Sequence, residues 1–106
     1  MENCIFCKIV NQQSPAEIIY TDQHIVVFKD LYPKANTHVL LIPKVHIVNL
    51  FELTPAHQQI MTHLIYKIPE IARTLGLNGF RTIINSGKEG GQVIDHLHFH
   101  ILSPVK

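Results

Sequence analysis

The stretch Asp95-His96-Leu97-His98-Phe99-His100-Ile101-Leu102 places three histidines at alternate positions, with apolar residues between them. Successive side chains of a β-strand point to opposite faces, so a strand would gather the three imidazoles on one face. A helix turns about 100° per residue and would scatter them. The β-branched and aromatic residues also favour a strand. We therefore predict a strand over residues 95–102 whose histidine face acts as nucleophile, base or metal site, the alternative being an ordinary polar face.

Length and composition indicate one globular domain spanning residues 1–106. The chain has 106 residues, 46% of them hydrophobic, and a formal net charge of +1. That charge balance argues against binding to nucleic acid or to a membrane surface, because both favour a basic excess. No apolar run approaches the roughly 20 residues that cross a bilayer, and the N-terminus does not resemble a signal peptide. We therefore expect a cytoplasmic protein.

The order of the predicted elements indicates an α+β fold with about five mainly antiparallel strands, one long helix and one short N-terminal helix. Apolar residues at helical spacing predict the short helix within residues 4–12. The long helix is predicted to begin at Thr54 as N-cap and to end at Gly76, with a kink or break at Pro69. The strands that precede the histidine strand are predicted over residues 17–21, 24–29, 37–43 and 80–85. The third of these is nearly all apolar, which predicts a central position.

A glycine-rich loop, Ser86-Gly87-Lys88-Glu89-Gly90-Gly91, directly precedes the histidine segment. Glycine lets a backbone approach a ligand closely and turn its N–H groups toward an anion. By themselves these glycines would also suit a flexible connection between strands. Beside three histidines they predict a phosphate-binding loop next to a nucleophile, because a histidine nitrogen can attack phosphorus and form a covalent intermediate. Loop amides and a second histidine would then stabilise the charge on the phosphate oxygens.

The His-x-His-x-His pattern with Gly-Gly-Gln before it resembles the histidine-triad (HIT) family, in its Hint branch. The resemblance covers nearly the whole chain, since residues 4–9, 28–30, 37–47 and 80–85 follow the family pattern in the same order. It implies a HIT-like fold and a homodimer whose two sheets join. It also implies a nucleotidyl hydrolase or transferase that acts at the α-phosphate of purine nucleotide phosphoramidates or acyl-nucleotides.

The resemblance further implies roles for individual residues. His98 is similar to the nucleophile that becomes nucleotidylated, and His100 to the residue that contacts the phosphate and the leaving group. His96 is similar to a supporting histidine, and His38 to a further member of this polar cluster. Asp30 resembles the carboxylate that holds the ribose hydroxyls, although it could equally cap the end of a strand. The residues that match the base pocket, and that could instead serve in core packing, are Ile5, Phe6, Ile9, Phe28 and Leu31. Those that match contacts near the phosphate are Asn85, Gly91, Gln92 and Val93.

Val93 departs from the family pattern, because many Hint members carry at this position a serine that hydrogen-bonds near the leaving group. Valine has no donor, and losing one polar contact in a transition state can cost about 10²–10³ in rate. This departure motivates a second hypothesis, a low-turnover purine nucleotide-binding or zinc scaffold protein. A dinucleoside polyphosphate hydrolase of the same family and a catalytic metal held by the three histidines also stay open. The remaining histidines, His24, His57 and His63, are assigned to solvated surface.

Cys4 and Cys7 form a Cys-x-x-Cys pair, which is half of a zinc site or a redox pair. In a cytoplasmic protein, thiols or metal ligands are favoured over a disulfide. Structural zinc takes four ligands in a tetrahedron, and His46 and His96 are candidates for the other two. Some bacterial HIT proteins resemble this chain in placing zinc between such a cysteine pair and these two histidine positions. Structural zinc, free buried thiols and redox chemistry all stay open from the sequence.

Overall fold

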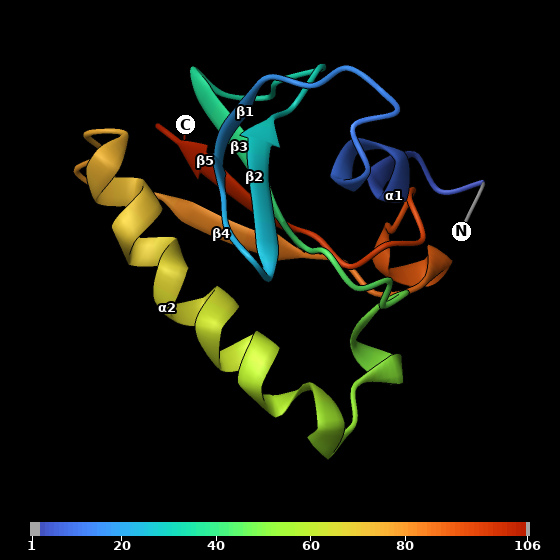
Figure 1. The fold of residues 1–106 in the computed structure, drawn as a ribbon. Helices are drawn as coiled ribbons and strands as arrows, with labels where there is room; N and C mark the ends of the chain where they lie inside the picture. The colour runs from blue at the N-terminus through green and yellow to red at the C-terminus, as the bar shows by residue number, and fades with distance from the viewer. Residues whose placement is uncertain (1–2, 106) are drawn as a thin grey trace.

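A five-stranded antiparallel sheet forms the centre of the structure, a computed structural model that describes residues 3–105 (Figure 1). Residues 1, 2 and 106 of the predicted domain lie outside this range. The strands are β1 (Ile18–Thr21), β2 (Ile25–Lys29), β3 (Thr37–Pro43), β4 (Arg81–Ile84) and β5 (Phe99–Ser103). Their order in the sheet is β1-β2-β3-β5-β4, with every neighbouring pair antiparallel. The predicted α+β class and the number of strands are confirmed.

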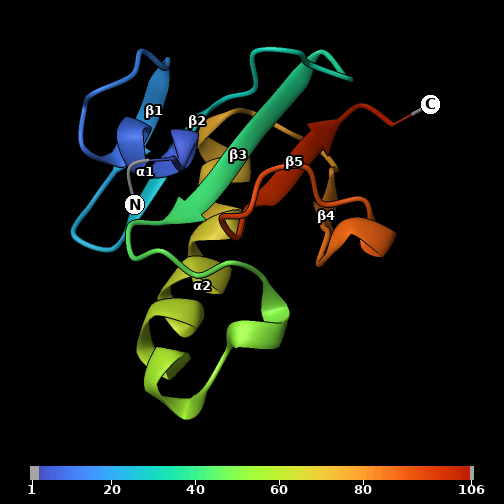
Figure 2. The ribbon, with the colours of Figure 1, turned by 90° about the vertical axis from the view of Figure 1, so that its right-hand side faces the viewer.

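Two helices cover opposite faces of this sheet (Figures 1 and 2). The long helix α2 (Gln58–Thr74) packs on one face, and the short helix α1 (Ile5–Val10) lies on the other. Both faces of β3 are therefore covered, and six of its seven residues are buried, as the apolar sequence predicts. The core beneath α2 is formed mainly by Ile25, Val27, Leu41, Leu64, Ile68, Leu97 and Ile101. The core beneath α1 consists of Phe6, Ile9, Val26, Phe28, Leu40 and Ile42.

Thr54 acts as a cap as predicted, but α2 itself begins only at Gln58, four residues later than the predicted start. Thr54 caps a short 3₁₀ turn, η2 (Pro55–His57), and the Nδ1 atom of His57 accepts a hydrogen bond of 3.1 Å from the backbone amide of Thr54. At the other end Gly76 adopts φ +73°, the left-handed conformation that favours glycine. α2 continues through Pro69, so the predicted break is absent. Packing of the buried face of the helix outweighs the single backbone hydrogen bond that proline removes.

The histidine segment is only partly a strand, which corrects the predicted range of 95–102. β5 begins at Phe99, which pairs with Leu41 of β3. The backbone amide of Leu97 instead bonds to the carbonyl of Ile47, beyond the end of β3, at 2.6 Å. Even so, the alternation of faces holds, because Leu97 and Ile101 lie in the core beneath α2 while the histidines face the side of α1.

The turn between β1 and β2 is tied to α2 through Asp22. Its carboxylate accepts hydrogen bonds from the hydroxyl of Tyr20 and from the backbone amides of His24 and Ile25, and it lies 2.7 Å from Nε2 of His63. Burial opposes ionisation of Asp22, but these hydrogen bonds outweigh it and hold the pKa of the carboxyl well below its usual range. The assignment of His63 to solvated surface is therefore wrong, since its ring joins the helix to the sheet.

No helix within residues 3–105 has both the length and the apolar character needed to cross a membrane.

Candidate active site and metal-binding cluster

His98 is held beside α1 in an orientation that leaves one particular ring nitrogen without a proton. Its Nδ1 atom lies 2.7 Å from the backbone carbonyl oxygen of His96. A carbonyl oxygen can only accept, so Nδ1 carries the proton and Nε2 keeps a free lone pair. The ring of Phe6 stands edge-to-face against that of His98 at 5.1 Å between centroids, which fixes the imidazole further. An unprotonated Nε2 in a packed position is what a nucleophilic histidine requires.

His100, His38 and Asp30 form a polar group beside His98. The rings of His98 and His100 lie 5.0 Å apart, and Nδ1 of His100 is 2.9 Å from Nε2 of His38. The same Nε2 atom lies 3.3 Å from one carboxylate oxygen of Asp30. The other oxygen of Asp30 accepts a hydrogen bond of 2.8 Å from the backbone amide of Tyr32. Asp30 therefore caps the turn after β2, which is one of its two predicted roles, and its second oxygen faces the histidines. Its contact with ribose hydroxyls stays a prediction.

The imidazoles of this group are neutral near pH 7. Burial lowers the pKa of His98 and of His38 below the ordinary histidine value. Burial, together with the neighbouring rings of His98 and His38, lowers the pKa of His100 to about 4. A neutral cluster leaves lone pairs available for attack and avoids repulsion between adjacent imidazolium ions.

Because the pKa of His100 is about 4 in the folded protein and about 6.5 in an unfolded chain, the unfolded state binds protons first as the pH falls. Stability is therefore fully present above pH ~6.5 and is lost as the pH falls toward 4. We expect His100 to account for a loss of about 1–2 kcal/mol between pH 7 and pH 5, after allowing for solvent screening at this partly exposed ring. Urea unfolding of the wild type and of His100→Gln at both pH values would measure it. An equal loss in the two proteins would contradict this prediction.

The glycine loop is more closed than the sequence predicts. It contains a 3₁₀ turn, η3 (Lys88–Gly90), flanked by Gly87 and Gly91 at φ +79° and +89°. The backbone amides of Gly90 and Gln92 donate to the carbonyl of Gly87, and that of Gly91 donates to Lys88, each at 3.0 Å. These three amides are therefore engaged within the loop and not directed at an anion, and the phosphate-binding role stays a prediction for the other backbone amides of this segment. The left-handed glycines serve instead to close the turn.

Gln92 braces this loop, and its side chain has no hydrogen-bonding capacity left for a nucleotide. Its Nε2 atom donates to the carbonyls of Val48 and Ile94, at 2.6 and 3.0 Å. Its Oε1 atom accepts from the amide of Gly87 at 2.8 Å and from the side chain of Asn49 at 3.1 Å. The two donor hydrogens and two acceptor positions of the amide group are thus all used. The predicted nucleotide contact of this side chain is replaced by a structural one.

The remaining predicted nucleotide contacts divide into buried and exposed sets. Phe6, Ile9 and Phe28 are buried in the core beneath α1, and the ring of Phe6 also packs edge-to-face against that of His98. Ile5 and Leu31 are 42% and 78% exposed. On the phosphate side, a Cβ placed on Gly91 would meet the side chain of Asn85 at 3.9 Å, and Val93 is 91% exposed. Val93 borders a cleft of about 780 Å³ together with Ile5, Cys4 and His46.

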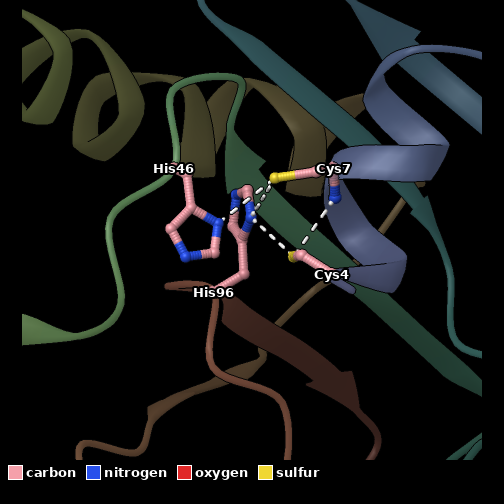
Figure 3. A group of neighbouring side chains, drawn as sticks. All are labelled: Cys4, Cys7, His46 and His96. Atoms are coloured by element: carbon pink, nitrogen blue, oxygen red, sulfur yellow. Dashed lines mark hydrogen bonds between the residues drawn. The ribbon is translucent and has the colours of Figure 1, made fainter. Parts of the chain in front are cut away.

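Cys4, Cys7, His46 and His96 converge from three separate segments (Figure 3). The cysteines come from the start of α1, where Sγ of Cys4 accepts from the amide of Cys7 at 3.3 Å. Nδ1 of His96 lies 3.4 and 3.6 Å from the two sulfur atoms, and Nδ1 of His46 lies 3.2 Å from Sγ of Cys7. The predicted four-residue set is therefore brought together, and the two cysteines are free thiols.

This cluster fits a tetrahedral zinc ion. With Zn–S and Zn–N bonds of about 2.3 and 2.05 Å, sulfur and nitrogen ligands lie roughly 3.6 Å apart. The observed separations of 3.2–3.6 Å agree with that value. Nε2 of His96 lies 2.8 Å from the carbonyl oxygen of Pro43, so Nε2 carries the proton and Nδ1 is free to bind a metal. Such a second bond is typical of a histidine that ligates a metal. Burial lowers the pKa of His96 to about 4, which keeps the ring neutral.

Comparison with known proteins places the whole chain in one family. A family model described as "Scavenger mRNA decapping enzyme C-term binding" matches residues 3–106. The chain is similar to protein HitA of Neisseria gonorrhoeae, with 50% identity over 99% of this chain and 100% of the relative. The structure of a HIT family hydrolase from Legionella pneumophila matches with a TM-score of 0.94 and 33% identity, covering 98% of this chain and 95% of that one. The chain belongs to the HIT family.

Two further HIT-family relatives bear on the site. The purine nucleoside phosphoramidase of Escherichia coli K12 is 35% identical over 95% of this chain and 87% of the relative. A histidine triad protein from Clostridium difficile has a structure that matches with a TM-score of 0.94 and 40% identity, covering 100% of this chain and 94% of that one. The HIT-like fold expected from the sequence is therefore confirmed.

The sequence did not point to the backbone groups that orient this HIT-family site. The carbonyl oxygens of Pro43 and His96 each accept from a ring nitrogen of a histidine. Every residue except proline carries both a backbone donor and an acceptor, so side-chain identity gives no signal for such roles. Asn49, which bonds to Gln92, was also missed. Its one signal is its place in the turn after the β3 segment, which is too general to indicate function.

Proposed function

We propose that this HIT-family chain hydrolyses purine nucleoside phosphoramidates and acyl-nucleotides at the α-phosphate, through a nucleotidyl intermediate on His98. The observation that carries the proposal is the orientation of His98, whose Nδ1 proton is given to the carbonyl of His96 while Nε2 stays free. The likeness to the E. coli relative, a purine nucleoside phosphoramidase, supports the substrate class.

In the proposed reaction, Nε2 of His98 attacks the α-phosphorus, and the bond from phosphorus to the leaving group breaks. The electron pair of that bond passes to the leaving group, to which the Nε2–H of neutral His100 donates a hydrogen bond while a solvent water supplies the proton. A second water then attacks the nucleotidyl-His98 and gives its proton to the hydroxide left by the first water. The nucleoside monophosphate is released and His98 returns to the neutral imidazole. Dividing the reaction into two displacements lowers the barrier of each, and the neutral state of His98 at pH 7 suits the first. Asp30, which is next to His38, is proposed to hold the ribose hydroxyls.

Trapping the covalent intermediate tests this proposal. Incubation with adenosine 5′-phosphoramidate, followed by rapid quenching and mass spectrometry, is expected to find an adenylyl group on the peptide that carries His98. The phosphorus–nitrogen bond of the adduct is stable in alkali and labile in acid, so the quench must be alkaline. An adduct on another residue, or turnover that proceeds with no adduct at any quench time, would contradict the proposed chemistry.

A binding protein with little turnover is the second candidate, and Val93 is the observation that favours it. Its exposed apolar side chain has no donor for a leaving group. A dinucleoside polyphosphate hydrolase of the same family would use the same histidines with a different leaving group. Single-turnover assays with a phosphoramidate, an acyl-adenylate and a diadenosine polyphosphate would distinguish these functions. Tight nucleotide binding without cleavage of any of the three would favour the scaffold.

We also propose that Cys4, Cys7, His46 and His96 hold a structural zinc ion, which would tie α1 to the segment before β5. The support is the agreement of the sulfur–nitrogen separations with tetrahedral geometry. The four protein ligands fill the coordination sphere, so the role of this zinc is in folding. A pair of free thiols also suits the reducing cytoplasm, which is the proposed location.

We propose a homodimer in which the β4 edges of two sheets meet. β4 has a neighbour on one side only, and an open edge of this kind favours pairing with another strand. Light scattering coupled to size-exclusion chromatography is expected to give twice the chain mass of 12.1 kDa. A mass of 12.1 kDa at micromolar concentration would contradict the dimer.

A further inference from the structure

The backbone amide of Lys34 points at a ring nitrogen of His38. The donor–acceptor distance from this amide to Nδ1 of His38 is 3.1 Å. A backbone N–H can only donate, so Nδ1 must offer a lone pair. Neutral His38 therefore carries its proton on Nε2. Burial keeps this ring neutral, since His38 is 5% exposed.

The tautomer of His38 determines the tautomer of His100. Nε2 of His38 lies 2.9 Å from Nδ1 of His100 and 3.3 Å from a carboxylate oxygen of Asp30. Because Nε2 of His38 is protonated, Nδ1 of His100 must accept, as two N–H groups cannot face each other at this distance. Neutral His100 then carries its own proton on Nε2. Each ring in this series accepts on one nitrogen and donates from the other.

We propose that the backbone amide of Lys34 is a positioning group, which acts through His38 to fix His100 as the tautomer with Nε2–H available to the leaving group. This inference rests on the proposed function for the role of that proton, whereas the tautomers themselves follow from the geometry. His98 has the opposite tautomer, because its Nδ1 faces a carbonyl oxygen. Two backbone groups of opposite polarity thus leave one imidazole with a free lone pair for attack and its neighbour with an N–H that can donate a hydrogen bond to the leaving group.

The same contact argues against a metal ion at Asp30, His38 and His100, although their ligand atoms lie within 4.8 Å of one another. A neutral histidine that binds a metal through Nε2 must carry its proton on Nδ1. At His38 that position faces the N–H of Lys34 at 3.1 Å, where a second N–H would be repelled. In the cysteine cluster, by contrast, the protonated nitrogen of His96 faces a carbonyl oxygen.

Long-range ¹H–¹⁵N correlation spectra of the full chain at pH 7.5, without substrate, read these tautomers directly. We expect the Nε2–H form for His38 and His100 and the Nδ1–H form for His98. Assignment uses the loss of signals in His38→Asn and His100→Gln. A Nδ1–H form of His38, or of His100, would overturn the proposal. This readout needs no turnover, so wild-type chain with the expected tautomers and no hydrolysis would contradict the proposed function and leave the tautomer assignment standing.

A matched pair of variants then removes either the amide hydrogen or only the side chain of Lys34. Lys34→Ala keeps the amide, and we expect the wild-type tautomers. Lys34→Pro lacks it, and we expect signals of the Nδ1–H form to appear at His38 and His100. We also expect kcat for a phosphoramidate to fall about 10–100-fold more than kcat for an acyl-adenylate, whose leaving carboxylate needs no proton. Wild-type tautomers in a folded Lys34→Pro, or equal losses with both substrates, would overturn the proposal. If Lys34→Pro does not fold, the spectra of the wild type and of Lys34→Ala decide.

Discussion

Replacing His98 with asparagine is expected to lower kcat for adenosine 5′-phosphoramidate by more than about 10⁴-fold, as removal of a covalent nucleophile does in other hydrolases. Asparagine suits the test because its amide can still donate to the carbonyl of His96, which His98 occupies through Nδ1 at 2.7 Å. Alanine would leave that acceptor without a partner, at a cost of about 1–3 kcal/mol in stability. Loss of activity in His98→Asn therefore reports on chemistry.

The measurement is steady-state turnover together with thermal unfolding of the same samples. His24→Asn is the matched control, since His24 is exposed at the turn between β1 and β2, away from the α1 side of the sheet. The control is expected to keep wild-type kcat. If folded His98→Asn retained turnover within about 100-fold of the wild type, His98 would not be the nucleophile. Removal of a covalent nucleophile lowers kcat by far more than that.

Removal of zinc is expected to produce the second large effect, on stability. A metal present at about 1,000 times its dissociation constant stabilises the folded chain by about 4 kcal/mol. For a domain of this size that corresponds to a fall in Tm of about 15 °C on removal. We expect elemental analysis to find one zinc per purified chain, and dialysis against a strong chelator to lower Tm by this amount. Cys7→Ala is expected to bind no zinc and to have the low Tm from the start.

His98→Asn provides the control that separates metal from catalysis, because it is expected to lose turnover while keeping its zinc. A purified chain without zinc, whose Tm does not respond to micromolar added zinc, would favour free buried thiols instead. Whether zinc is bound or the thiols are free decides what His96 contacts, because its Nδ1 atom lies 3.4 Å from Sγ of Cys4. Without a metal, the hydrogen-bond partners of that nitrogen are the two cysteine sulfur atoms.

Much of the fold could be predicted from local patterns. The apolar β3 segment, the capping residue Thr54 and Gly76 each act through neighbours in the sequence, and each appears where expected. The extent of β5 was overestimated, because alternation shows which way side chains point and not whether a partner strand continues beside them. Pairing with β3 begins at Phe99. The segment before it approaches the chain beyond β3 and the cysteines of α1 instead.

The glycine loop is a second case in which local sequence patterns do not determine the hydrogen bonds that form. Three glycines in a short stretch indicate unusual backbone angles, and two of them do adopt the left-handed conformation. The sequence could not show that the neighbouring amides would close a turn among themselves. Nor could it show that the side chain of Gln92 would be fully used, since two of its four partners, Val48 and Asn49, lie more than 40 residues away in the chain.

By itself the sequence determined that three histidines share a face, that two cysteines form a pair, and that the whole pattern is of the HIT type. Only the tertiary structure decided how the histidines divide: His96 lies with Cys4, 92 residues away in the chain, and His100 lies with His38, 62 residues away. It also decided which nitrogen of each ring carries the proton. The physical reason is that a tautomer is set by the donor or acceptor that faces each nitrogen. Those partners are brought into place by sheet register and loop closure, which residue types alone do not encode.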